Sequence, residues 1–143
     1  MTAIAPMTGR CLCGACSFTA TPEALQGAIC HCVQCQKWSG GIFMSVECGA
    51  STVFKEGAPV GTYASSEWAE RLFCKDCGTT LVWQMKDGTH QGVAIAAFDD
   101  QDVFSVSREI FIDCKPAAYA MAGNLAQFTE AETMAKFAPE GGA

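Results

Sequence analysis

Short apolar segments separated by turn-forming residues recur along the chain, and they predict strands more often than helices. Residues 16–20 alternate in polarity as a half-buried strand does, and Thr21-Pro22 ends that segment. Further strands are predicted over residues 42–46, 52–54, 60–64, 70–74, 80–84, 92–98 and 109–112. Many short strands with frequent turns are typical of a mainly β domain.

Helical patterns are confined to two places. Residues 34–38 fit a single helical turn that Ser39-Gly40-Gly41 stops, and residues 130–137 are good helix formers. No repeat or low-complexity linker divides the 143 residues, a length that suits one domain. We therefore expect an N-terminal arm over residues 1–8, one domain over 9–128, and a C-terminal helix and tail over 129–143.

Composition and charge exclude several classes of protein. Half of the residues are apolar, which excludes a disordered chain. No apolar run approaches the roughly 20 residues that span a bilayer, and the first residues lack the pattern of a signal peptide. The net charge of −6 argues against a nucleic-acid partner, which needs a basic face. We expect a cytoplasmic protein with neither membrane nor nucleic acid as partner.

The ten cysteines carry the strongest chemical signal. An intracellular compartment keeps thiols reduced, so disulfides are not expected. The thiols instead cluster as C-x-C and C-x-x-C groups, which is typical of metal sites. The densest group is Cys30-His31-Cys32-Val33-Gln34-Cys35. Packing does not require thiols at that density, whereas Zn²⁺ binds them in tetrahedral geometry at about 2.3 Å.

A first zinc site is predicted from two distant pairs of cysteines. Each pair alone is too small for a tetrahedral ion, and each is followed closely by a glycine, Gly14 or Gly78, that suits a tight turn around a thiolate. The four ligands would be Cys11, Cys13, Cys74 and Cys77. Such a site is closed, and therefore structural. The alternative is a set of buried thiols that bind no metal.

A second site is predicted on Cys30, Cys32 and Cys35. One alternative is a second structural zinc whose fourth ligand is one of the following: Cys16, His31, Cys48, His90 or Cys114. The other is an open fourth position that takes water or a substrate thiol, as catalytic zinc sites do. Zinc with three thiolates has a net charge near −1, which suits thiol chemistry better than water activation.

Other residues are candidates for ligand binding, each with a simpler alternative. His31 could orient the second site or transfer a proton, or be a spacer facing solvent. Arg71 could hold a carboxylate of an anionic ligand, or form a surface ion pair. Ser65 and Ser66 could donate hydrogen bonds to a ligand, or cap a turn. Lys37, beside the three thiols, completes this set of candidates.

These motifs resemble one known family over roughly residues 8–128. The matching stretches are Gly9-x-Cys11-x-Cys13-Gly14, Cys30-His31-Cys32-x-x-Cys35-x-Lys37-x-Ser39-Gly40, Tyr63-x-Ser65-Ser66 and Arg71-x-Phe73-Cys74-x-x-Cys77-Gly78-x-x-Leu81. The sequence is similar to the glutathione-dependent formaldehyde-activating enzymes, also called the centromere protein V/GFA domain. Both the spacing of the cysteines and the flanking glycines match that family.

The resemblance implies a fold and an activity. The fold would be Mss4-like, with several small curved antiparallel sheets pinned by zinc. One structural zinc and one catalytic zinc would occupy the two clusters, with His31 among the catalytic residues. The implied reaction is formation of S-(hydroxymethyl)glutathione from glutathione and formaldehyde, a carbon–sulfur lyase activity. The implied partners are thus a small thiol, with glutathione as co-substrate, and an aldehyde.

The later blocks of the sequence depart from the family pattern. Glu109 stands where family members often carry a histidine, and Ala118 and Tyr119 occupy a region where a tryptophan is common. Residues 125–128 read Leu-Ala-Gln-Phe where Leu-Pro-x-Phe is usual, and Ala96-Ala97-Phe98 replaces a Gly-Thr motif. Two further hypotheses remain open: a zinc-stapled binding module without enzymatic activity, and a redox sensor that releases zinc when its thiols are oxidised.

Overall fold

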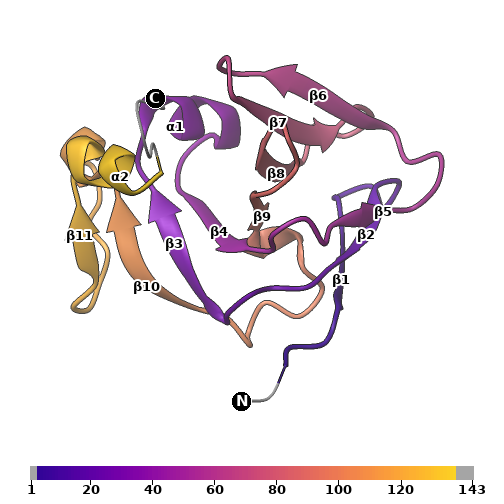
Figure 1. Ribbon diagram of the computed structural model, residues 1–143, viewed down its shortest axis with the longest axis horizontal. Helices are drawn as coiled ribbons and strands as arrows, with labels where there is room; N and C mark the ends of the chain where they lie inside the picture. The colour runs from indigo at the N-terminus through magenta and orange to yellow at the C-terminus, as the bar shows by residue number, and fades with distance from the viewer. Residues whose placement is uncertain (1–2, 138–143) are drawn as a thin grey trace. The chain divides into compact units, whose positions relative to one another are not determined.

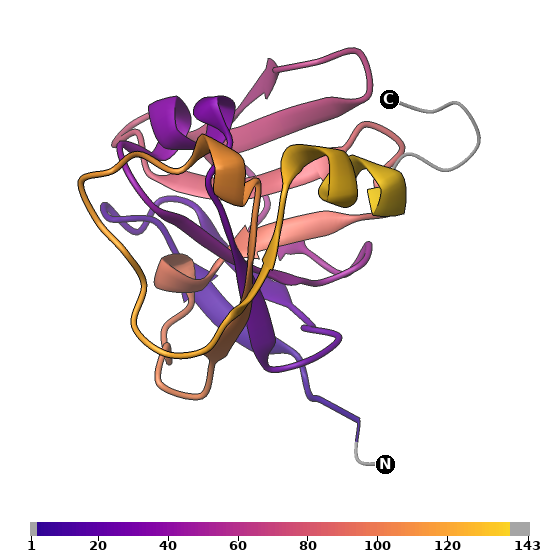
Figure 2. The ribbon, with the colours of Figure 1, turned by 90° about the vertical axis from the view of Figure 1, so that its left-hand side faces the viewer.

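The computed structural model describes residues 3–137, and strands dominate them (Figures 1 and 2). The strands are β1 Met7–Arg10, β2 Ser17–Ala20, β3 Gln26–Cys30, β4 Phe43–Glu47, β5 Val53–Phe54, β6 Val60–Ala64, β7 Ala69–Cys74, β8 Thr80–Met85, β9 Gln91–Ala94, β10 Ser105–Ile110 and β11 Ala126–Phe128. The helices are α1 Val33–Ser39 and α2 Glu130–Phe137, with 3₁₀ turns η1 Ile95–Ala97 and η2 Ile112–Cys114. The predicted mainly β class is confirmed.

The chain forms two compact units. Unit 1 comprises Met1–Gly27 and Ser45–Ser105, and unit 2 comprises Ala28–Met44 and Val106–Ala143. The boundaries between them fall inside β3, inside β4 and at the start of β10. Each unit holds one of the two predicted thiol clusters, so each is described by itself.

Unit 1 is built from antiparallel strands. In one sheet β2 pairs with both β1 and β5. The other strands follow the order β4-β9-β8-β7-β6, and each neighbouring pair is antiparallel. Leu81, Val82 and Val93 are fully buried between these strands. Phe18 packs edge-on against Phe98, with ring centroids 5.6 Å apart. This apolar core holds the turns that carry the first thiol cluster.

Unit 2 contains a parallel pair of strands, which the prediction of antiparallel sheets did not include. β10 and β11 pair in register, with Glu109 opposite Gln127 and Ile110 opposite Phe128. Parallel pairing needs a crossover of about a dozen residues or more, and residues 111–125 provide that length. Helix α2 follows β11 directly and lies beside this pair (Figure 1).

Several element boundaries differ from the predictions. The predicted strand 92–98 ends at Ala94 and continues as η1, because an unbroken apolar run does not distinguish strand from helix. The predicted strand 109–112 is β10, which ends at Ile110 because Phe111 adopts left-handed backbone angles (φ 56°). β1, β3 and β11 were not predicted, and the expected arm over residues 1–8 includes the start of β1.

Other elements lie where the sequence places them. β6 and α2 have the predicted bounds, whereas the predicted turn at 34–38 is the longer helix α1. Gly40 ends α1 in the left-handed conformation (φ 79°), and its N–H donates to the Gln36 carbonyl. The predicted tail beyond α2 lies outside the described residues.

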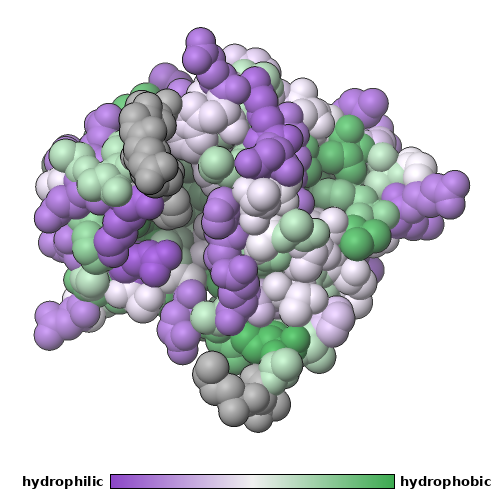
Figure 3. Space-filling view, in the orientation of Figure 1, coloured by the Kyte–Doolittle hydropathy of each residue, from purple (hydrophilic) through white to green (hydrophobic). Residues whose placement is uncertain are grey.

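None of the helices within residues 3–137 is both long and apolar enough to cross a membrane. On the face drawn in Figure 3, polar side chains are interspersed with separate apolar patches. The exposed apolar residues of unit 1 include Leu12, in the turn between two of the predicted zinc ligands, and Val53 on β5.

Candidate metal centres

The first thiol cluster, termed site one, brings together the two distant cysteine pairs of unit 1. The four Sγ atoms lie within 4.8 Å of one another, and they belong to Cys11, Cys13, Cys74 and Cys77. Cys13 Sγ is 3.6 Å from Cys11 Sγ and 3.8 Å from Cys74 Sγ. Four sulfurs placed tetrahedrally at 2.3 Å from Zn²⁺ are about 3.8 Å apart. The donor set and its spacing therefore fit a structural zinc ion.

Backbone N–H groups point at these sulfurs. The N–H of Cys16 donates to Cys11 Sγ (3.2 Å), and the N–H of Cys77 donates to Cys74 Sγ (3.4 Å). Gly14 (φ 84°) and Gly78 (φ 79°) give each turn the left-handed conformation that it needs, as the sequence predicts. Such hydrogen bonds favour the thiolate form, which is the form that binds a metal ion.

Thr79 connects the two turns of site one. Its Oγ1 accepts from the N–H of Leu12 (3.0 Å) and lies 3.1 Å from Cys77 Sγ. The Thr79 hydroxyl therefore donates to that sulfur and lowers the pKa of Cys77 to about 5. Thr79 was not among the residues predicted for the site, although its place directly after Gly78 was a usable signal.

The second cluster, termed site two, lies in unit 2 where β3 ends and α1 begins. The Sγ atoms of Cys30, Cys32 and Cys35 lie within 4.8 Å of one another. Cys32 is the N-cap of α1, and its Sγ accepts from the N–H of Cys35 (3.3 Å). A hydrogen bond with the Cys32 side chain raises the pKa of Cys30, as expected for thiols crowded together. Three thiols on one short segment suit a soft divalent ion.

Helix α1 holds site two against the rest of unit 2. Gln36 Nε2 donates to the carbonyl of His31 (2.6 Å) and to that of Cys114 in η2 (3.1 Å). Ser39 Oγ donates to the carbonyl of Cys35 (2.7 Å). These bonds fix the turn that presents the thiols, so their arrangement does not depend on a metal ion alone.

Within the described part of unit 2, no fourth Cys, His, Asp or Glu joins these three thiols. Of the alternatives for that role, Cys114 lies 3.9 Å from Glu130 Oε1. Cys16, Cys48 and His90 belong to unit 1 and have partners there: Cys11, Val46 and Glu47 respectively. Burial raises the pKa of Cys16 and that of Cys48 to about 12, which keeps both as neutral thiols.

His31 is fully buried, which excludes the prediction of a spacer facing solvent. Its Nε2 lies 2.8 Å from Glu109 Oε1, and its Nδ1 lies 2.9 Å from the hydroxyl of Tyr119. Both ring nitrogens are thus occupied, which argues against His31 as a metal ligand. Burial alone would raise the pKa of Glu109, but hydrogen bonds from Gln127 and His31 lower it overall. Glu109 is therefore the acceptor, and His31 donates through Nε2.

Two of the positions at which the later part of the sequence departs from the family pattern belong to this network. Glu109 and Tyr119 stand where the sequence differs from the usual residues, and both contact His31. Gln127 Nε2 donates to the second carboxylate oxygen of Glu109 (3.1 Å). Sequence reasoning did not predict this network: Glu109 and Tyr119 were noted as departures, but nothing in the sequence pairs them with His31.

The predicted ligand-binding residues lie in both units. Arg71 is buried on β7, opposite Tyr63 and Trp83 in the strand register, and so is not a surface residue. Ser66 Oγ accepts from the N–H of Ala69 (3.0 Å) and so closes the turn before β7. Ser65 precedes that turn in unit 1, and Lys37 is exposed in the last turn of α1 in unit 2.

A mainly β fold with two thiol clusters defines a class of cysteine-rich proteins that could hold metal ions. The sequence model of one family, described as glutathione-dependent formaldehyde-activating enzyme, matches residues 6–114. The chain therefore belongs to that family.

Two of the individual proteins similar to the chain support this assignment or its fold. One, from Schizosaccharomyces pombe and named an uncharacterized lyase, is 36% identical over 127 residues, which are 88% of this chain and 93% of that protein. The other is a Rhodobacter sphaeroides protein of known crystal structure, with a TM-score of 0.58 and 20% identity. The match covers 71% of this chain and 100% of that one. The second likeness supports the fold alone.

Proposed function

We propose that the protein is a zinc-dependent enzyme of the carbon–sulfur lyase type that acts on the adduct of a small thiol and an aldehyde. The observation that carries the proposal is the three-thiol set of site two, beside which unit 2 offers no fourth ligand among its described residues. Membership of the family and the lyase name of the yeast relative support the same reaction class. Glutathione and formaldehyde are the proposed substrates, and the cytoplasm is the proposed location.

The reaction is an addition that needs no further reactant. The glutathione sulfur forms a bond to the carbonyl carbon while the carbon–oxygen π pair moves to oxygen. The oxygen then takes a proton equivalent to the one that left the thiol, which gives S-(hydroxymethyl)glutathione. Zinc bound by Cys30, Cys32 and Cys35 would lower the pKa of the incoming thiol and so supply the thiolate.

The chain's own residues would hold the reacting groups and handle the proton. Glu109 and Tyr119 hold the two ring nitrogens of His31, so the ring is fixed in one orientation. We therefore assign His31 to orienting the turn between Cys30 and Cys32. Tyr119 is only partly buried, and its hydroxyl is the outer member of the network, so it is the proposed relay of the proton.

Charged and polar groups would bind the ends of glutathione. Arg71 in unit 1 and Lys37 in unit 2 are each proposed separately as a holder of a ligand carboxylate, which a guanidinium can bind through two parallel hydrogen bonds. The hydroxyls of Ser65 and Ser66 are the proposed donors to its peptide groups. These assignments predict a higher KM for glutathione, with a smaller change in kcat, when Arg71 is replaced by Lys.

The test is the rate of adduct formation, measured by exchange NMR with ¹³C-formaldehyde and glutathione at equilibrium. The zinc-loaded protein should accelerate the exchange above the uncatalysed rate. Cys32→Ser should return it to that rate, whereas Cys114→Ser removes a thiol of unit 2 outside the cluster and should leave it unchanged. Full exchange activity in Cys32→Ser would exclude this mechanism. No acceleration by wild-type protein with two bound zinc ions would favour a binding module instead.

A further inference from the structure

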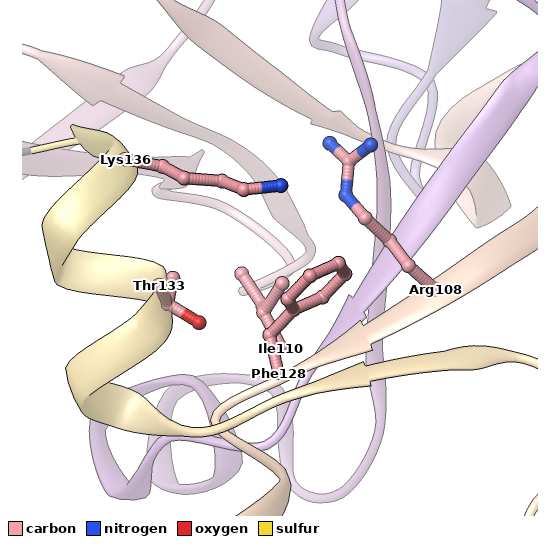
Figure 4. A pocket seen from close by; sticks show the side chains of 5 residues that line it. All are labelled: Arg108, Ile110, Phe128, Thr133 and Lys136. Atoms are coloured by element: carbon pink, nitrogen blue, oxygen red, sulfur yellow. The ribbon is translucent and has the colours of Figure 1, made fainter.

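Unit 2 contains a pocket on the far side of β10 from the His31 network. The pocket has a volume of about 230 Å³ and is lined by Arg108, Ile110, Phe128, Thr133 and Lys136 (Figure 4). Successive side chains of a strand point to opposite faces, so Arg108 and Ile110 face the pocket while Glu109 between them faces His31. The pocket is thus formed by β10, β11 and α2 and does not include the thiols.

Two positive charges share the opening of this pocket. Lys136 extends from α2 and Arg108 from β10, and the two side chains approach each other above Ile110 and Phe128 (Figure 4). Neither forms an ion pair with any carboxylate among residues 3–137. The two positive charges repel each other. An anion bound between them would attract both and so offset that repulsion. Two neighbouring cations that lack a carboxylate partner among the described residues stand out in a chain whose net charge is −6.

The walls of the pocket are apolar below the charges. Lys136 Nζ lies 4.2 Å from the centroid of the Phe128 ring, so the ammonium group rests on an aromatic face. Thr133 is buried, and its hydroxyl, which lies on the pocket side of α2 (Figure 4), already donates to the Thr129 carbonyl. The volume is smaller than that of sites for drug-sized ligands, which begin at about 300 Å³. A short apolar or aromatic group fits these walls.

We propose that this pocket binds a small organic carboxylate that has a short apolar or aromatic body. The carboxylate lies between Arg108 and Lys136, with the guanidinium donating two hydrogen bonds to it, and the apolar body contacts Ile110 and Phe128. This site is additional to the thiol-aldehyde chemistry proposed above and does not depend on it.

The probes are benzoate and hexanoate, titrated by calorimetry into the full-length zinc-loaded protein. Saturable binding of one equivalent is expected, and its affinity should fall as the salt concentration rises. Benzyl alcohol, which has a similar body without the charge, should bind at least about tenfold more weakly, because hydrogen bonds to charged groups are lost. Inorganic phosphate, which has the charge without the body, should also bind more weakly.

Charge-neutral variants locate the site. Arg108→Gln and Lys136→Gln should each weaken benzoate binding by about tenfold, whereas Lys55→Gln removes an exposed charge of unit 1 and should leave it unchanged. Thermal unfolding of each variant is measured first, so that loss of binding is not confused with loss of fold. The proposal is overturned if benzoate and hexanoate show no saturable binding at 10 mM, on the order of the weakest useful affinities. Equal affinity in all three variants, or for benzyl alcohol, would equally overturn it.

Discussion

The two thiol clusters use the same ligand atoms and the same local turn, but they are assembled in different ways. Site one takes its four sulfurs from two segments, and Cys13 and Cys74 are 61 residues apart. Site two takes its three sulfurs from residues 30–35 alone. The first cluster therefore joins distant parts of unit 1. The second lies on one short segment at the start of α1.

Under the proposed function, this difference separates a structural metal site from a catalytic one. Binding of structural Zn²⁺ is worth about 10–16 kcal/mol, which equals or exceeds the net stability of a typical domain. Losing site one therefore removes the link that closes the chain between residues 13 and 74. Losing site two removes a local ion while the hydrogen bonds of Gln36 and Ser39 still hold the turn.

The largest effect is expected for Cys74→Ser. Cys74 is fully buried and is one of the four ligands of site one, so its loss should cost more than about 5 kcal/mol and leave the protein unfolded at 25 °C. Circular dichroism and the ratio of zinc to protein measure both consequences. A cooperative transition at the wild-type Tm would show that site one is not structural. Cys114→Ser is the control for removal of a thiol outside both clusters.

A smaller effect on the fold is expected for Cys32→Ser. The zinc content should fall from two ions to one, and the thermal transition should remain cooperative because site one is intact. Excess glutathione should likewise displace or exchange only the ion of site two in wild-type protein. Zinc content measured after gel filtration distinguishes the two sites. Retention of both ions by the variant would mean that a further residue closes site two.

An intermediate loss is expected for Glu109→Ala. The change removes the buried acceptor of His31 and Gln127. The free energy of unfolding should therefore fall by about 1–3 kcal/mol. The affinity of site two for zinc should fall, measured by competition with a chelator, while that of site one should not change. Glu109→Gln keeps an acceptor and should lose less. Equal weakening of both sites would show that the effect is a general loss of stability.

The contribution of Glu109 to the free energy of unfolding should also depend on pH. Its pKa in the folded protein is lowered from 4.5, so the carboxylate stabilises the native state above the unfolded pKa and this stabilisation is lost as pH falls through the folded pKa. The difference in unfolding free energy between wild type and Glu109→Gln should therefore be constant near pH 6 and shrink below pH 4.5. Denaturant titrations at each pH measure it. A difference that does not shrink would exclude the ionised form as the source.

The smallest effect is expected for Thr79→Ala. The variant loses the hydrogen bond from Leu12 and the contact with Cys77, which should lower the free energy of unfolding by about 1 kcal/mol. The pKa of Cys77 should also rise, because the Thr79 hydroxyl lowers it in the wild-type protein. Thr79→Ser keeps the hydroxyl and should behave as wild type. Chemical denaturation gives the free energy, and the pH at which zinc is released reports on the thiolate. No difference between the two variants would assign the effect to the methyl group.

The sequence predicted both thiol clusters because their residues carry local signals. Cysteines at fixed spacing and the glycines at 14 and 78 are visible without a structure, and the structure brings the two distant pairs together. The network around His31 was not predictable in the same way. Glu109 and Tyr119, the partners of His31, lie far from it in the sequence. No sequence motif indicates that residues so far apart will be in contact. The parallel pairing of β10 and β11 depends equally on distant partners.

The separation of the two halves of site one also has a consequence for biosynthesis. A ribosome releases the chain from its N-terminus at about 5–20 residues per second, so all three thiols of site two emerge together. Cys11 and Cys13 must wait until Cys74 and Cys77 have left the exit tunnel before they can share an ion. The nascent chain can therefore acquire a metal ion at residues 30–35 several seconds before unit 1 closes. Zinc available during translation would then bind first at site two and only later at site one.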